Sequence, residues 1–120
     1  MIKNRLSVEM NNLAKQIERV IKEGDLVSKG KVAMGKVKRP NEIVLQVYDP
    51  RKVNSLYSAF HALSTGDMLT FQVNNEGIIT QDPSKVDDGK RPTAAIARNV
   101  EETLYSMGVK YDQREGKYLV

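Results

Sequence analysis

The sequence predicts an α+β fold in which three helices alternate with three β-hairpins, in the order α-ββ-α-ββ-α-ββ. Three segments have apolar residues spaced three and four positions apart, which is typical of amphipathic helices. The shorter segments between them alternate apolar and polar residues around turn-forming residues, which is typical of hairpins. We therefore expect a mainly antiparallel sheet with the helices packed on one face. The 120 residues have the length of a single domain, residues 1–120.

Residues 1–24 predict an N-terminal amphipathic helix that ends at Gly24. Its apolar stripe is narrow and nearly of coiled-coil form, which suits packing against another helix. The stripe either docks within the chain or pairs two subunits, and the modest apolar content of the chain favours pairing. The predicted oligomer interface consists of Leu6, Met10, Leu13, Ile17 and Val20.

Residues 27–48 predict a hairpin whose second strand alternates regularly through Ile43, Leu45 and Val47. The first strand is out of phase, because Val32 and Met34 are even-numbered and Val37 is odd-numbered. One extra residue in a bulge near Gly35 would bring all three onto the core face. The lysines between them would then share the opposite face of the hairpin.

The net charge of +4 is concentrated in residues 27–40, which contain five Lys and Arg and no acidic residue. A local basic patch indicates a polyanionic partner. The alternative is a solvated strand surface, since lysines on edge strands also prevent aggregation. The predicted nucleic-acid-binding residues are Lys29, Lys31, Lys36, Lys38, Arg39 and Tyr48. Lys31, Lys36 and Lys38 are expected on the basic face with Tyr48, Lys29 beside them, and Arg39 in the turn of the hairpin.

The dipeptide Asp49-Pro50 predicts the start of the second helix, with an N-cap carboxylate followed by proline. Gly66 is expected to end this helix. A second hairpin follows at residues 68–81, with its turn at residues 74–77. The helix residues expected to face the core are Val53, Leu56, Tyr57, Phe60 and Leu63.

Residues 82–91 predict a mobile loop because they mix Pro, Gly and charged residues. A third helix is expected from Pro92 to Met107, followed by a terminal hairpin over residues 109–120. Cations just before a helix N-terminus favour anions, as does the helix dipole. The alternative ligand-binding residues are therefore Lys90, Arg91, Thr93 and Arg98, unless Asp87 and Asp88 simply balance the charge of the loop.

Catalytic chemistry has little support in the sequence. The chain has no Cys and only one His, His61, so no histidine pair or thiolate can form a metal site or a nucleophilic pair. We predict that the protein is not an enzyme and uses no cofactor or metal. No apolar segment is long enough to cross a membrane and no signal peptide is evident, so we expect a cytoplasmic protein without membrane contacts.

These features favour a small homo-oligomeric nucleic-acid-binding accessory or regulatory protein. With only seven aromatic residues, we expect non-specific backbone contacts more than base stacking, with Tyr48 as the candidate stacking residue. The alternative is a non-catalytic binder or inhibitor of a small anionic ligand, such as a nucleotide, or of a protein partner, as in phage or mobile-element accessory factors. A purely structural assembly subunit is a third hypothesis.

Overall fold

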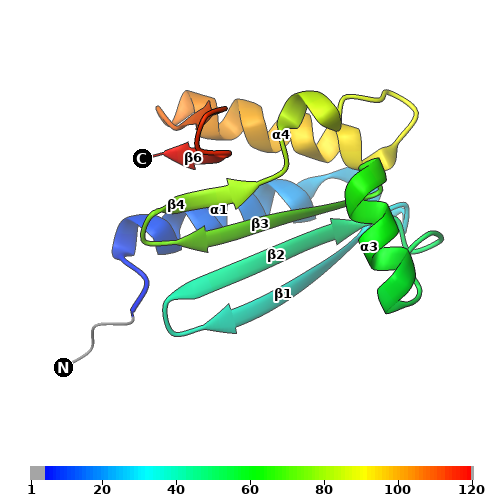
Figure 1. Cartoon of the computed structure of the whole chain (residues 1–120), viewed down its shortest axis with the longest axis horizontal. Coiled ribbons are helices and arrows are strands. Elements are labelled where there is room, and N and C mark those ends of the chain that lie inside the picture. Colours follow the sequence, from blue (N-terminus) through cyan, green and yellow to red (C-terminus); the bar gives the residue numbers. More distant parts are fainter. Residues whose placement is uncertain (1–4, 120) are drawn as a thin grey trace.

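In the computed structural model, the sheet has six antiparallel strands, and two long helices lie on one of its faces (Figure 1). The predicted fold class is therefore confirmed. The model describes residues 5–119, so residues 1–4 of the predicted first helix and Val120 of the last hairpin lie outside it. No helix in these residues combines the length and apolar character that a membrane crossing needs.

The strand order across the sheet is β1-β2-β3-β4-β6-β5, which makes β1 and β5 the two edges. The strands are β1 (Ala33–Arg39), β2 (Glu42–Tyr48), β3 (Met68–Asn74), β4 (Gly77–Thr80), β5 (Lys110–Asp112) and β6 (Lys117–Leu119). The helices are α1 (Val8–Glu23), α2 (Asp25–Ser28), α3 (Leu56–Thr65) and α4 (Pro92–Ser106), with a 3₁₀ turn η1 (Pro83–Lys85).

The core lies between the sheet and the pair α1 and α4, which contact each other. Ser7 begins α1 as its N-cap, with its hydroxyl accepting a hydrogen bond from the Met10 N–H. The stripe predicted to pair subunits faces this core. Leu6, Met10, Leu13 and Ile17 are buried in the single chain, and Val20 is half-buried. The stripe thus has a partner within the chain, so the structure presents it in the core instead of on a surface open to a second subunit.

The predicted bulge near Gly35 is wrong. Strand β1 pairs with β2 without interruption, from Ala33 opposite Tyr48 to Arg39 opposite Glu42. Residues opposite each other in an antiparallel pair point to the same face of the sheet. Lys36 lies opposite the buried Leu45, so it is on the helix-covered face, whereas Val37 points to the open face.

The predicted start and orientation of α3 are also wrong. Residues 50–53 turn back on Asp49, whose carbonyl accepts from the N–H groups of Lys52 and Val53, and the helix begins only at Leu56. A capping box between Ser55 and Ser58 fixes this start. The helix packs through the small side chain of Ala62, so Leu56, Tyr57 and Phe60 point into solvent.

The other face of the sheet has no long helix across it, and α3 covers only one end of it (Figure 1). Met68 is on this face, since it lies opposite Tyr48, yet it is buried, and α3 contacts β3 there. Ala33 pairs with Tyr48, which pairs with Met68 on its other side. The α2–β1, β2–α3 and α3–β3 loops therefore meet at one end of the sheet.

Gly77 at the β3–β4 turn packs against the backbone of β6. Its φ of +141° is unfavourable for other residues, and an added Cβ would lie 2.5 Å from the Tyr118 carbonyl oxygen. We expect Gly77→Ala to lower the free energy of unfolding by about 2 kcal/mol or more, since strained backbone and a clash combine. Urea denaturation measures this change.

Two other glycines are matched controls for this prediction. Gly30 has a φ of +72° but open space around it, so Gly30→Ala should cost only about 1 kcal/mol. Gly89 has neither a positive φ nor a close neighbour, and Gly89→Ala should be neutral. Equal stability of the Gly77 and Gly89 variants would contradict the close approach of β6.

Candidate nucleic-acid interface

Four lysines lie along the β1 edge of the sheet and in the loop before it, and we call this group the basic edge: Lys29, Lys31, Lys36 and Lys38. The loop is well defined. Lys29 ends α2, Gly30 reverses the chain with a φ of +72°, and the buried Val32 anchors the entry into β1. A positive φ at this turn suits Gly. All four lysines are exposed.

Lys36 reaches back to helix α1. Its Nζ lies 2.9 Å from Glu18 Oε2, while Lys22 Nζ lies 3.1 Å from Glu18 Oε1. The hydrogen bond from Lys36 is the main reason that the pKa of Glu18 lies below its usual value. The single carboxylate of Glu18 therefore pairs with the ammonium groups of both Lys36 and Lys22, so this part of the edge keeps a net positive charge.

The other three lysines of the basic edge have no such counter-charge. In residues 5–119, no carboxylate forms an ion pair with Lys29, Lys31 or Lys38. Lys38 lies opposite Ile43, and thus on the same face of β1 as Lys36. Its charge and those of the two loop lysines remain directed to solvent.

Arg39 and Tyr48 do not join these lysines. Both point to the open face of the sheet, where Arg39 Nη1 lies 2.7 Å from Glu42 Oε2. The Gln72 amide also donates to Glu42, and this bond, followed by the one from Arg39, lowers the pKa of Glu42. The six predicted residues are thus split, with four at the edge and two on the open face.

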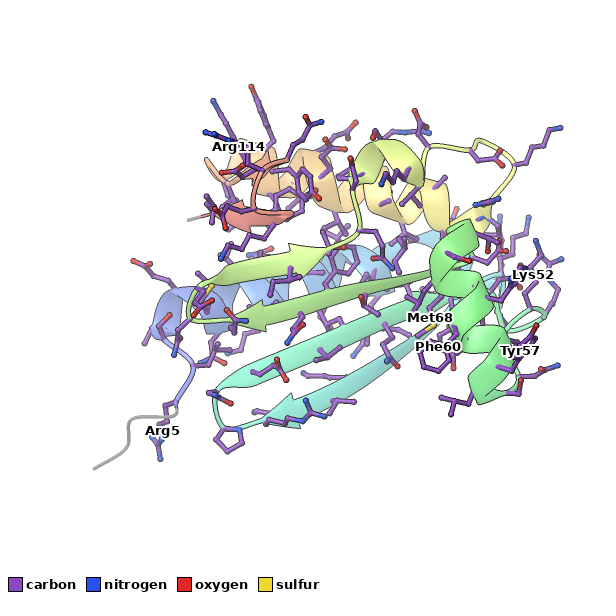
Figure 2. The ribbon with its side chains drawn as sticks, viewed as in Figure 1. Arg5, Lys52, Tyr57, Phe60, Met68 and Arg114 are labelled. Carbon is purple, nitrogen blue, oxygen red and sulfur yellow. The ribbon has the colours of Figure 1, made fainter. Side chains whose placement is uncertain are left out.

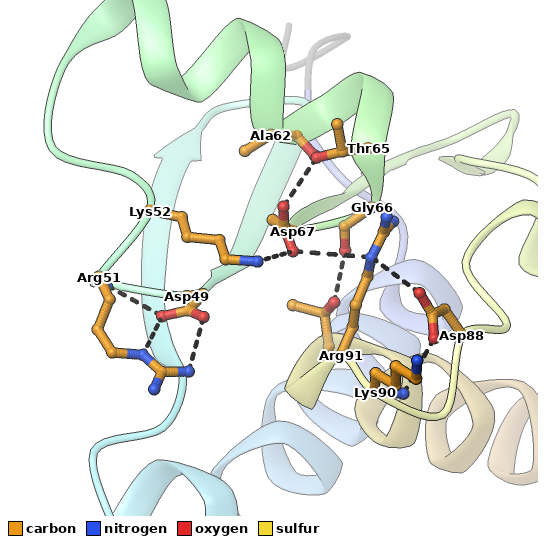
Figure 3. A network of polar contacts seen from close by, with 11 residues as sticks. Asp49, Arg51, Lys52, Ala62, Thr65, Gly66, Asp67, Asp88, Lys90 and Arg91 are labelled. Carbon is orange, nitrogen blue, oxygen red and sulfur yellow. Dashed lines mark hydrogen bonds and ion pairs between the residues drawn. The ribbon is translucent and has the colours of Figure 1, made fainter.

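A polar network fixes the loops at the end of the sheet where β1 begins (Figure 3). Asp49 is 1% exposed, and both of its carboxylate oxygens lie 3.0 Å from the Arg51 guanidinium. These bonds from Arg51 lower the pKa of Asp49. A buried charge requires such pairing, so Arg51 is held in place while its side chain stays 72% exposed.

Asp67 is the second buried carboxylate of this network. It accepts from the Thr65 hydroxyl at 2.9 Å and lies 3.4 Å from Lys52 Nζ and 3.8 Å from Arg91 Nε. Arg91 crosses closely over Gly66, where an added Cβ would lie 2.7 Å from Arg91 Nη1. The network therefore joins the end of α3 and the β2–α3 loop to the start of α4.

Three of the four residues predicted for an alternative anion site, Arg91, Thr93 and Arg98, have side-chain partners within the chain. Thr93 is fully buried and donates to the Gly66 carbonyl. Arg91 pairs with Asp67 and Asp88, and Arg98 lies 3.5 Å from Asp87. Lys90 is exposed, and its backbone N–H bonds to Asp88. The 82–91 loop predicted to be mobile contains η1 and these bonds.

The sequence prediction missed two cations beside the basic edge. Because Ala33 pairs with Tyr48, the residues just after Tyr48 lie alongside those just before Ala33. Arg51 and Lys52 therefore lie at the end of the sheet where β1 begins, where both are exposed and each pairs with a buried carboxylate, Asp49 or Asp67. The sequence shows both cations directly after Asp49-Pro50. That dipeptide predicts a helix start, so the sequence prediction assigns the two cations to the helix instead of to an exposed loop.

Comparisons with protein families, with curated proteins and with solved structures find no match to this chain. In residues 5–119, no three histidine or acidic side chains lie close enough together to hold a metal ion. Exposed charged side chains are therefore the main chemical feature of the described surface.

The Asp49–Arg51 pair predicts a defined dependence of stability on pH. Asp49→Asn should lower the free energy of unfolding by about 1–3 kcal/mol near neutral pH, because a charge-assisted buried bond is weakened. The folded pKa lies below the unfolded one, so the wild-type advantage is full above about pH 4 and disappears as the pH falls through the folded pKa.

Urea denaturation of both proteins from about pH 7 to about pH 3 tests this dependence. The exposed Asp87 provides the control, since Asp87→Asn removes a surface pair that contributes little. A wild-type advantage that stays constant down to the lowest pH would show that the charge of Asp49 is not what stabilises the loop.

Proposed function

We propose that this protein binds nucleic acid along the basic edge, through contacts with the phosphate backbone. The observation that carries the proposal is the uncompensated charge of Lys29, Lys31 and Lys38 on an uncovered sheet edge. Exposed lysines without a carboxylate partner attract polyanions and release counterions when they bind.

The shape of the edge supports an extended ligand. Strand β1 is seven residues long, which corresponds to about 23 Å at the usual rise of a strand. Lys31 and Lys29 precede its first residue in the chain, and Arg51 belongs to the β2–α3 loop at the same end of the sheet. A row of cations of this length can follow several consecutive phosphates of one strand.

The residue types favour binding without sequence preference. Lysine presents a mobile point charge, whereas reading a base edge usually requires paired donors or acceptors such as those of Arg, Asn or Gln. The one arginine of the acid-free stretch, Arg39, is bound to Glu42 on the other face. The basic edge is therefore suited to phosphates and not to base edges.

The proposal predicts a strong effect of charge removal at the edge. The triple variant Lys29→Gln, Lys31→Gln, Lys38→Gln should weaken binding to a fluorescein-labelled oligonucleotide at least tenfold at low salt. It should also reduce the slope of log K against log salt by about 2–3, since about one contact is lost per lysine. Fluorescence anisotropy over a salt series measures both quantities.

A matched control removes the same charge elsewhere. Lys85, Lys110 and Arg114 are exposed and lie in η1, in β5 and in the β5–β6 turn, at the far edge of the sheet from β1. Their replacement by Gln should change affinity much less. If both triple variants lose the same affinity, only the net charge matters and the basic edge is not the site. If neither loses affinity, the proposed function is wrong.

A further inference from the structure

We propose that the nucleic acid is single-stranded and that its bases stack on Tyr57 and Phe60 of α3. This inference rests on the proposed function and names the class of ligand. It follows from the unexpected orientation of α3, which exposes aromatic rings at the end of the basic edge.

The exposure of α3 is unusual for a helix of a small protein. Leu56 is 77% exposed, Tyr57 84% and Phe60 67%. Single exposed apolar residues are common, but a contiguous group of large ones marks a contact site. The helix also contains no Lys, Arg, Asp or Glu, so an uncharged planar group meets no unpaired charge on it.

Cations connect this aromatic surface to the basic edge. The β2–α3 loop contains Arg51 and Lys52, whose side chains are 72% and 55% exposed. Tyr57 follows in the first turn of α3, and Figure 2 shows Tyr57 and Phe60 at the end of the molecule where Lys52 lies. Exposed cations therefore lie in the chain directly before the two rings, at the end of the sheet where β1 begins.

A polyanion with free base faces fits this combination. In a duplex the bases are stacked on one another, whereas in a single strand they are available to aromatic side chains. Grooves that bind single strands combine cations along the backbone with aromatic side chains under the bases. The exposed cations beside the rings favour this ligand over an apolar protein surface, because an apolar partner would cover Arg51 and Lys52 without offering them any negative charge beyond that of Asp49 and Asp67.

The first experiment compares single and double strands. We expect the wild-type protein to bind an oligothymidine of about 20 nucleotides more tightly than a duplex of equal length. The double variant Tyr57→Ala, Phe60→Ala should lose about tenfold or more in affinity for the single strand, with an unchanged salt slope and unchanged duplex binding. The rings are exposed, so the variant should keep its fold, which circular dichroism checks.

Tyr105 of α4 provides the matched control. It is 63% exposed, and the ammonium group of Lys110 lies 5.5 Å from its ring centroid, so it too is an exposed tyrosine beside a cation. Tyr105→Ala should leave single-strand affinity unchanged. An equal loss from Tyr105→Ala would overturn the assignment of stacking to α3.

The second experiment detects stacking without relying on affinity. The chain has no Trp, so Tyr57→Trp introduces a single indole on α3. We expect quenching of its fluorescence when oligothymidine is added and no quenching with the duplex. Tyr105→Trp is the control and should not respond to either.

The outcomes separate this inference from the proposed function. If the α3 variants bind a single strand as wild type does while the Lys29, Lys31, Lys38 variant does not, nucleic-acid binding stands and stacking is wrong. If light scattering shows a dimer that the α3 double variant abolishes, the rings serve self-association and the inference is overturned. If all variants bind alike, both proposals fail.

Discussion

The alternation of strand β2 is the constraint on which the rest of the structure depends. Ile43, Leu45 and Val47 are buried against the helices, and β2 pairs with a neighbour on each side. Because opposite residues of antiparallel strands share a face, these three side chains determine which residues of β1 and β3 face the helices. A slip of one residue would turn the whole apolar set toward solvent.

This constraint places Lys36 and Lys38 on a face that hydrophobicity alone would not assign to them. They tolerate it because β1 is an edge strand, so a long side chain can cover apolar surface with its methylene groups and keep its ammonium group in water. The ammonium group of Lys36 forms an ion pair with Glu18 of α1. Val37, by contrast, is 40% exposed on the open face of this edge strand.

The sequence was sufficient to predict the order of the main elements and the antiparallel sheet, because strong periodicity determines these features. Of the three helices predicted on one face, α1 and α4 lie there, whereas α3 covers one end of the other face. The sequence was insufficient to predict which residues of β1 face the helices. The apolar residues of β1 follow no single alternation, and the pairing with β2 determines the face of each residue. The sequence also failed for α3, because a pattern of large apolar residues indicates an amphipathic helix but does not show which side meets the sheet. The small side chain of Ala62 permits close packing, and local hydrogen bonds to Asp49 delay the helix start. Four of the six predicted interface residues nonetheless lie together, since closeness in sequence kept them on one strand and its loop.

Protection against aggregation is the strongest competing explanation for the lysines of β1. An edge strand with unpaired backbone groups benefits from charged side chains, and Lys36 and Lys38 serve that purpose in any case. Lys29 and Lys31 precede the strand, however, and Arg51 and Lys52 belong to another loop, so none of them guards the edge. Edge protection also gives no reason for a helix that exposes Tyr57 and Phe60 beside these cations, since exposed rings promote association. The proposed single-stranded ligand would account for the edge, the two loops and the aromatic helix together, because each of these features would contact a different part of it.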